Sequence, residues 1–300
     1  MAVLTYLVGL PGSGKSWVAE TLKKQREEDG RQVVILSSDS LREELYGNEE
    51  DQQHNDNIFE EMQKRTIENL QNNIDVIYDA TNINRKKRIT FLNSLPKSTT
   101  KVCWIVWSRL DTCVKRDSNR SRKVGYDVIK RMALNFQVPW YDEGWTDITV
   151  YRNDSMYNDS DFNLDIPHDS VWHKGTIKDH IERVEQAIWE DYENLSLEEE
   201  TLMRQVAHLH DIGKPIAKTF VNSKGETTKE AHYYGHENVS SYIALEWEPY
   251  YGSDRLLISY IISQHMQPHL QQQTRYFKNM EDKKIKSLIE KFSKYDDIGK

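Results

Sequence analysis

Short apolar runs alternate with longer polar segments along the first half of the chain. The apolar runs lie at residues 3–8, 33–36, 76–78, 102–107 and 148–150. Runs of this kind predict buried strands, and the polar segments between them, such as residues 17–28 and 57–72, predict helices. Alternating strands and helices favour a parallel sheet that is flanked by helices and joined by right-handed crossovers.

The pattern changes after a polar stretch at residues 151–170. This stretch, YRNDSMYNDSDFNLDIPHDS, is rich in Asn, Asp and Ser, which predicts a loop. Beyond it the β-rich runs end, and apolar positions recur every three or four residues, as on one helix face, at Ile177, Ile181, Val184 and Ile188. The segment SLEE at residues 196–199 has the form of a capping box. We expect an α/β domain over residues 1–152, a linker over 153–164 and an all-α domain over 165–300.

Length and composition restrict the class of protein. A chain of 300 residues agrees with two domains, because one core rarely grows far beyond about 250 residues. The sequence has no apolar run near the ~18 residues of a membrane span, and its uncharged start predicts a core strand, so we expect no membrane contact. The two cysteines form no CxxC, which favours a reducing cytoplasm. A net charge of −8 argues against a coat on nucleic acid but allows a local basic site.

The segment GLPGSGKS, residues 9–16, has the G-x-x-x-x-G-K-[ST] spacing of a phosphate-binding loop (P-loop) between a predicted strand and a predicted helix. Its glycines let backbone N–H groups curl around a phosphate, and the helix N-terminus adds positive potential. Lys15 is expected to reach the β and γ phosphates and Ser16 the Mg²⁺. The segment predicts that ATP or another NTP binds with Mg²⁺ at Gly9, Pro11, Gly12, Ser13, Gly14, Lys15 and Ser16.

Polar residues follow the next two strands. Asp39 and Arg42 lie at the carboxyl end of the second strand, the edge that faces the P-loop in such a sheet. A carboxylate there can accept a proton from an attacking hydroxyl, and an arginine can hold a phosphate of the acceptor. The alternative is that Asp39 caps a helix and Arg42 is solvated. Asp79 ends the third strand and is placed to orient the Mg²⁺ shell.

Two basic segments come later in this half. Residues 113–131 carry seven Lys or Arg against two Asp, and Arg116 and Arg120 would share a helix face. They predict a lid that stabilises transferring phosphoryl charge, with a structural salt-bridge helix as the alternative. Residues 85–88, RKKR, more often form a solvated helix face.

The second half gathers histidines. His210 and Asp211 are adjacent at the end of an amphipathic segment, and His180, His236 and His265 lie in other helix-like segments. A lone histidine is usually structural, but several helices that deliver imidazoles beside a carboxylate favour a divalent transition metal such as Mn, Ni, Co, Cu or Fe. We expect ordinary structural roles for His54, His168, His208, His232 and His269.

The first half resembles phage-type polynucleotide 5′-kinases. The resemblance covers most of residues 1–152 and is carried by GLPGSGKS, by Asp39-x-x-Arg42, by DATNINRKKR and by VKRDSNR followed by VIKRM. It implies Asp39 as general base, Arg42 as the contact to an acceptor phosphate, and Arg116 and Arg120 as contacts to donor phosphates. Asp-Ala-Thr-Asn also occurs in related small-molecule kinases, which leaves the size of the acceptor open.

Residues 165–300 resemble the HD phosphohydrolase superfamily, through HDIGK and GHENVSS. The resemblance implies His180, His210 and Asp211 as metal ligands, with a late aspartate for which Asp297 fits better than Asp296. It implies that His236 and His265 bind a second metal or the scissile phosphate, and that Lys214, with His173 as a candidate, contacts phosphate oxygens. Metal-assisted attack by water is the expected chemistry.

Taken whole, the chain resembles bifunctional end-healing enzymes of RNA repair, with the kinase first. The resemblance implies phosphorylation of 5′-hydroxyl ends and hydrolysis of 3′-phosphate or 2′,3′-cyclic phosphate ends, on RNA or alternatively DNA, together with a separate ligase. The alternative function is a small-molecule or nucleoside kinase joined to an HD nucleotide phosphohydrolase.

Overall fold

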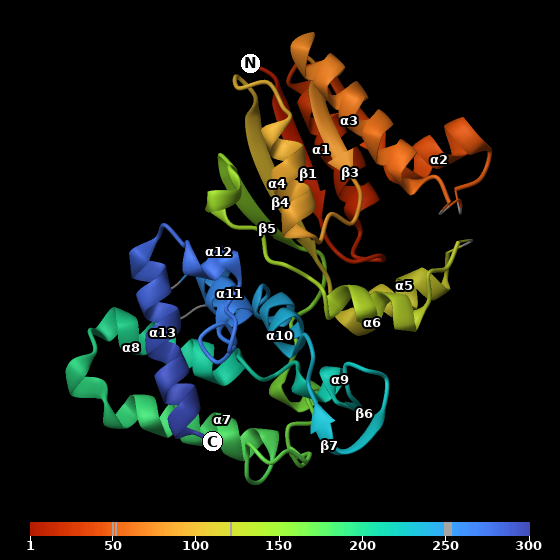
Figure 1. Ribbon diagram of the computed structural model, residues 1–300. Coiled ribbons are helices and arrows are strands. Elements are labelled where there is room, and N and C mark those ends of the chain that lie inside the picture. Colours follow the sequence, from red (N-terminus) through yellow and green to blue (C-terminus); the bar gives the residue numbers. More distant parts are fainter. Residues whose placement is uncertain (50, 52, 121, 249–253) are drawn as a thin grey trace. The chain divides into compact units, whose positions relative to one another are not determined.

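A computed structural model describes residues 1–49, 51, 53–120, 122–248 and 254–300 (Figure 1). The chain forms two compact units. The first contains residues 1–132 and 139–155, and the second contains residues 133–138 and 156–300. The predicted linker, residues 153–164, is therefore divided between the units, and six residues from the predicted first domain belong to the second unit.

The first unit is built on a parallel sheet of five strands in the order β2-β3-β1-β4-β5. The strands are β1 (Val3–Val8), β2 (Val33–Ser37), β3 (Asp75–Asp79), β4 (Thr100–Trp107) and β5 (Asp147–Arg152). Each predicted apolar run lies inside one of them. Every pairing is parallel, so each connection must cross over, as the alternating pattern predicted.

Helices pack on both faces of this sheet because alternate side chains of each strand point to opposite faces. One face buries Leu7 and Ile77 against Val18 and Leu22 of α1 (Lys15–Glu28). On the other face the rings of Tyr6 and Tyr78 stack at 4.8 Å and meet Phe91, which belongs to α4. The remaining elements of this unit are α2 (Ser38–Tyr46), α3 (Asn55–Gln71), α4 (Arg85–Asn93), α5 (Leu110–Ser118), α6 (Tyr126–Ala133) and η1 (Tyr141–Glu143).

The basic run at residues 85–88 is a solvated face only at Lys86 and Lys87, which are exposed. Arg88 is fully buried, and its Nε and Nη2 atoms each donate to a carboxylate oxygen of Glu143 at 2.7 Å. Arg85 donates to Asp142 at 2.8 Å. Both carboxylates lie in η1, more than 50 residues later in the chain, so α4 is fixed to η1 by ion pairs that the local sequence does not reveal.

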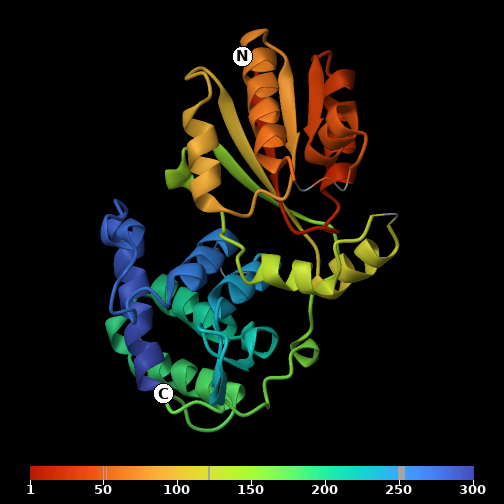
Figure 2. The same cartoon turned by 45° about the vertical axis from the view of Figure 1, so that its right-hand side comes forward.

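The second unit is a helical bundle, coloured green to blue in Figure 2. Its helices are α7 (Ile177–Glu190), α8 (Leu197–Leu209), α9 (Lys214–Ala217), α10 (His236–Ala244), α11 (Arg255–Gln264), α12 (Arg275–Lys278) and α13 (Lys283–Ile298), with 3₁₀ turns at residues 159–161 and 192–194. The predicted apolar face of α7 is buried, and Ser196 and Glu199 form the predicted capping box of α8. Helix α7 packs on α8 and α13, and α10 packs on α11.

The second unit is not entirely helical. An antiparallel hairpin of β6 (Thr219–Val221) and β7 (Thr227–His232) lies between α9 and α10. Most side chains of this hairpin are exposed, so its two strands show no long apolar run in the sequence. Among the described residues, no helix has both the length and the apolar character needed to cross a bilayer.

Candidate functional site

The P-loop connects β1 to α1 in the first unit. Gly14 has φ of 97°, and a Cβ atom added there would lie 2.1 Å from Nδ2 of Asn153, so only glycine fits. Ser13 Oγ is buried and has no hydrogen-bond partner within the described chain. Lys15 Nζ donates to the carbonyl of Leu10 at 2.8 Å. A cradle that a Cβ would fill, lined by an unpaired hydroxyl and a lysine, suits a phosphate group.

A hydrogen-bonded pair of side chains adjoins the loop. Ser16 Oγ donates to Asp79 Oδ2 at 2.8 Å, which brings together two predicted Mg²⁺ residues from α1 and β3. Burial lowers the pKa of the Lys15 ammonium and raises the pKa of the Asp79 carboxyl. Each charge is thus costly without a partner, and the phosphate of a bound nucleotide with its Mg²⁺ would supply partners of both signs.

Asp39 and Arg42 lie together just after β2. Arg42 Nη1 donates to Asp39 Oδ1 at 2.7 Å, and its Nη2 donates to Asn55 at 2.8 Å. The cap of α2 is Ser37, whose side chain accepts from Ser40, so Asp39 does not serve as the cap. Arg42 is buried, whereas 52% of the Asp39 side chain is exposed. The carboxylate is therefore open to an acceptor while the arginine orients it.

The basic segment supplies one contact that sequence reasoning missed. Arg122 Nη1 donates to Asp39 Oδ1 at 2.6 Å. The spacing of residues 113–131 marks a basic segment but does not tell which arginine turns toward Asp39. Ser121, in the same predicted lid, lies outside the described residues.

Arg116 and Arg120 have different surroundings. Arg116 donates to the carbonyl of Gly12 at 3.4 Å, to Ser108 Oγ at 2.9 Å and to the carbonyl of Asn153 at 3.0 Å. It braces the P-loop from the protein side. Arg120 is exposed, and its positive charge contributes to the lowered pKa of Lys15, so it lies near the loop. The remaining predicted loop residues, Gly9, Pro11 and Gly12, are buried in the turn itself.

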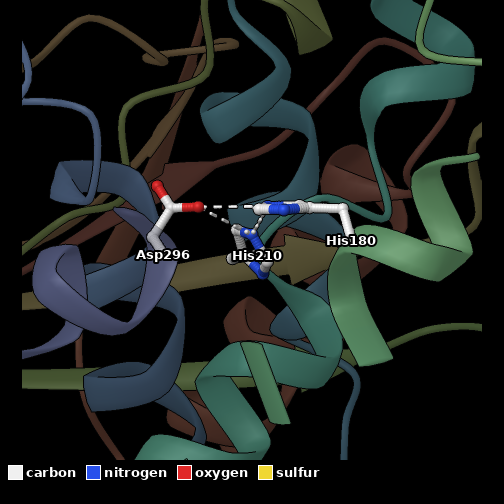
Figure 3. A group of neighbouring side chains, drawn as sticks. All are labelled: His180, His210 and Asp296. Carbon is white, nitrogen blue, oxygen red and sulfur yellow. Dashed lines mark hydrogen bonds and ion pairs between the residues drawn. The ribbon is translucent and has the colours of Figure 1, made fainter. Parts of the chain in front are cut away.

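In the second unit, three side chains from α7, α13 and the end of α8 point toward one another (Figure 3). His180 Nε2 lies 3.2 Å from His210 Nε2 and 3.0 Å from Asp296 Oδ1. His210 Nε2 lies 3.6 Å from the same oxygen. All three are buried, and their ligand atoms are close enough to hold one metal ion.

Asp211, His236 and His265 form a second buried group of the same kind. His236 Nε2 lies 3.4 Å from His265 Nε2 and 3.3 Å from Asp211 Oδ1. The other oxygen of Asp211, Oδ2, faces His180 at 3.3 Å and His210 at 3.4 Å. The Asp211 carboxylate thus lies between the two groups, with one oxygen toward each.

The four imidazoles share one orientation. Each Nδ1 is hydrogen-bonded to a backbone carbonyl, that of Ala207, Tyr233, Ile262 or Gly299, at 2.7–3.0 Å. A carbonyl only accepts, so each Nδ1 carries a proton and each Nε2 points to the centre, where it can bind a metal once it carries no proton of its own. This is the arrangement that fixes the tautomer of metal-ligating histidines.

The charge balance of the two groups also suits a cation. Burial by itself raises the pKa of Asp211, but the positive charges of His210 and Lys214 hold it well below its usual range. Burial alone lowers the pKa of His210, and the neighbouring carboxylates instead raise it to about 10. Both oxygens of Asp211 lack a hydrogen bond within the described chain, although Lys214 Nζ is ion-paired at 2.5 Å. Nitrogen and carboxylate donors of this kind fit a divalent transition metal.

The late aspartate of the cluster is Asp296, and this corrects the expectation for Asp297. Asp297 is the next residue on α13, about 100° around the helix, so its side chain leaves the centre. It is 57% exposed and pairs with Lys300 at 2.5 Å. Asp296 Oδ2 instead accepts from His269 Nε2 at 2.9 Å, so His269, which we expected to be ordinary, holds a cluster carboxylate.

Lys214 and two further histidines lie beside these groups. Lys214 is buried, and its ammonium is 5.4 Å from the Tyr233 ring centroid. The rings of His168 and His173 stack at 4.2 Å, and the His173 ring meets the edge of His180 at 4.7 Å. Burial and the nearby Lys214 charge lower the pKa of His168 to about 3 and that of His173 to about 2, so both are neutral. His168 was expected to be ordinary and carried no spacing signal.

Comparisons with known proteins place one family match within the chain. Residues 4–139 match the family described as an AAA domain. The L-seryl-tRNA(Sec) kinase of Methanococcus maripaludis is 30% identical over 161 residues, which is 52% of this chain and 62% of that protein. The chain thus spans less than two thirds of this curated relative.

Solved structures show weaker likenesses. The Pnkp1/Rnl/Hen1 RNA repair complex has a chain that is 23% identical, with a TM-score of 0.39 over 44% of this chain and 42% of its own. A gluconokinase from Sinorhizobium meliloti 1021 is 16% identical, with a TM-score of 0.34 over 50% of this chain and 81% of its own. Likenesses this low do not establish a shared fold. The AAA-domain match, the parallel sheet and the P-loop together fit a kinase-type P-loop domain in the first unit.

Proposed function

We propose that the chain heals broken nucleic-acid ends. The first unit transfers the γ phosphate of ATP or another NTP to a 5′-hydroxyl, and the second hydrolyses a terminal 3′-phosphate or 2′,3′-cyclic phosphate. RNA is favoured, because a cyclic end requires a 2′-hydroxyl, and a separate ligase would join the healed ends. The observation that carries the proposal is that one chain has both a P-loop whose Lys15 lies within electrostatic reach of Asp39 and converging imidazoles around Asp211.

In the first unit, Asp39 would accept the proton of the attacking hydroxyl. Its carboxylate is exposed and is oriented by Arg42 and Arg122, so it can meet an acceptor without rearrangement. Arg42 would contact a phosphate of the acceptor strand. A bound Mg²⁺-nucleotide supplies the phosphoryl group and neutralises its charge, while Lys15 and Ser16 position it.

In the second unit, the Nε2 atoms of the four imidazoles and the two buried carboxylates would hold the metal, and a bound divalent metal supplies Lewis acidity and lowers the pKa of water toward 7. Lys214 would hold a phosphate oxygen, because its ammonium is ion-paired with Asp211, the carboxylate that lies between the two histidine groups. Helix packing around the cluster excludes bulk water, which strengthens these charge interactions.

A second candidate concerns the acceptor of the kinase. The relative at 30% identity is named as a kinase of L-seryl-tRNA(Sec), which favours a hydroxyl carried on an RNA by an amino acid. The second unit would then act as an HD nucleotide phosphohydrolase. The same geometry at Asp39 could serve either acceptor, since a general base does not distinguish hydroxyls by itself.

Two singly blocked oligonucleotides separate the activities. We expect a 5′-hydroxyl RNA with a 3′-hydroxyl to gain one phosphate in the presence of ATP and Mg²⁺. A 5′-phosphorylated RNA with a 3′-phosphate should lose one in the presence of Mn²⁺ or Ni²⁺, by mass spectrometry. Phosphorylation of seryl-tRNA or a free nucleoside in place of the oligonucleotide would favour the second candidate.

Matched variants test whether the sites are separate. Asp39→Asn should lose only phosphorylation, and Asp211→Asn should lose only hydrolysis. Loss of both activities in either variant, with thermal unfolding unchanged, would contradict two independent sites. No reaction with any of these substrates would overturn the proposal itself.

A further inference from the structure

An exposed tryptophan lies next to the histidine groups. Backbone bridges pair Pro167 with Thr176 and Ser170 with His173, so residues 167–176 form a narrow turn with Val171 and Trp172 at its tip. Trp172 is 72% exposed and Val171 is 70% exposed. Tryptophan is highly buried on average, so an indole at the tip of a bridged turn has its large planar face available to a ligand.

This turn is fastened to the rest of the unit. Ala231 N donates to the carbonyl of Asp169 at 2.7 Å, and Lys218 Nζ donates to Asp169 Oδ2 at 2.8 Å. The hydroxyl of Tyr233 donates to the carbonyl of His168. Strand β7 and the end of α9 therefore hold the base of the turn, so little ordering entropy remains to be lost when a ligand meets its tip.

The turn leads directly to the cluster. His173, the residue after Trp172, contacts the His180 ring at 4.7 Å, and adjacent Cα atoms are about 3.8 Å apart. A second exposed aromatic, Tyr234, lies two residues before His236 and is 51% exposed. Its ring stacks on His232 at 5.4 Å with an interplanar angle of 8°. Two planar faces thus lie within two residues of cluster or cluster-contacting histidines.

We propose that Trp172 stacks on the terminal base of a single-stranded polynucleotide whose end phosphate lies at the histidine groups. This inference rests on the proposed hydrolysis of nucleic-acid ends and names what positions the strand. Along the turn the indole comes first, then His173 and then the cluster. Along a 3′ end the base, the sugar and the phosphate follow one another in the same way. Stacking on an indole accepts any base, because every base has a π face, and the phosphate charge is met separately by Lys214 and the metal groups.

Kinetics with a pair of matched substrates tests this assignment. One is an RNA with a 3′-phosphate, and the other is identical except that its last nucleotide lacks the base. Trp172→Ala should lower kcat/KM for the complete RNA by about 5- to 150-fold and leave the abasic RNA unchanged. Trp172→Phe should retain most of the activity because a phenyl ring still stacks.

Trp189→Ala is the matched control. Trp189 is also exposed, at 55%, but lies nine residues after His180 on α7, about 13 Å along the helix. It should leave both substrates unchanged. A second readout is fluorescence anisotropy with a 3′-hydroxyl RNA, the reaction product, for which Trp172→Ala should weaken binding by a similar factor.

The outcomes separate the inference from the function on which it rests. Equal loss for complete and abasic RNA, or no loss at all, in Trp172→Ala would overturn the stacking assignment while hydrolysis stands. If the unmodified protein hydrolyses neither RNA, the proposed function fails, and the anisotropy measurement still decides whether Trp172 binds a base. Equal weakening by Trp189→Ala would also overturn the assignment.

Discussion

Two adjacent carboxylates on α13 provide a sharp test of the histidine cluster. Asp296 has 7% of its side chain exposed, with Oδ1 3.0 Å from His180 Nε2 and Oδ2 2.9 Å from His269 Nε2. Asp297 is 57% exposed and pairs with Lys300. Asparagine has nearly the shape of aspartate without its charge. Asp296→Asn and Asp297→Asn therefore remove the same charge at neighbouring positions, one inside the cluster and one outside.

The expected magnitudes differ widely. Loss of groups that only orient a metal ligand costs about 10- to 100-fold in affinity. Asp296→Asn turns a charged ligand into a neutral amide and so removes one of the two buried carboxylates, and we therefore expect at least about 100-fold weaker binding. Asp297→Asn breaks an exposed ion pair worth about 0–1 kcal/mol, so the affinity should change by less than about fivefold.

Isothermal titration of chelator-treated protein with Mn²⁺ or Ni²⁺ measures both affinities, and thermal unfolding checks that each variant is folded. Retained affinity in Asp296→Asn together with loss in Asp297→Asn would assign the ligand to Asp297 and refute the geometry. Undiminished affinity in both variants would show that this cluster does not hold the metal.

Three further outcomes are expected. Asp39→Asn should lower kcat for phosphorylation by about 10²- to 10⁴-fold with nucleotide affinity unchanged, by steady-state kinetics and nucleotide titration; an unchanged kcat would remove the base assignment. Gly14→Ala should destabilise the chain by about 1–3 kcal/mol and abolish nucleotide binding, because the new Cβ meets Asn153. The control Gly30→Ala, at a φ of 75° in open space, should keep nucleotide binding. The pKa of His210 is raised to about 10, so this histidine is protonated at neutral pH and metal binding should release a proton. Metal affinity should therefore rise about tenfold per pH unit from about pH 6 to 8. Calorimetry in buffers of different protonation enthalpy measures the released proton, and no release would contradict this prediction.

The sheet could be predicted because its information is local. Each strand of the first unit contains an apolar run, which is buried in β1 and β3 and partly buried in β2, β4 and β5. The P-loop is a contiguous segment whose glycine at position 14 has the left-handed conformation that the motif requires. The predicted strand at residues 3–8 has the same bounds as β1. The hairpin of β6 and β7 was missed because its side chains are mostly exposed and show no apolar run.

Tertiary pairings could not be predicted. The RKKR segment reads as a solvated face, yet Arg88 is buried because Glu143, 55 residues away, neutralises it. Likewise the family resemblance favoured Asp297 over Asp296, and only the rotation of α13 against α7 brings Asp296 to His180 instead. His168 and His269 are lone histidines without spacing partners, and their places beside the cluster follow from folding alone.

The two candidate sites therefore differ in what makes them precise. The P-loop is shaped by its own backbone, so a short segment both encodes and reveals it. In the histidine groups, three rings are oriented locally, since His210, His236 and His265 each bond the carbonyl three residues earlier. His180 instead bonds the carbonyl of Gly299, 119 residues away, and a Cβ at Gly299 would lie 2.4 Å from Val184. The packing of α13 on α7 thus sets the orientation of His180 and the convergence of all four imidazoles. Changes in that packing should therefore weaken metal binding even where every ligand is intact.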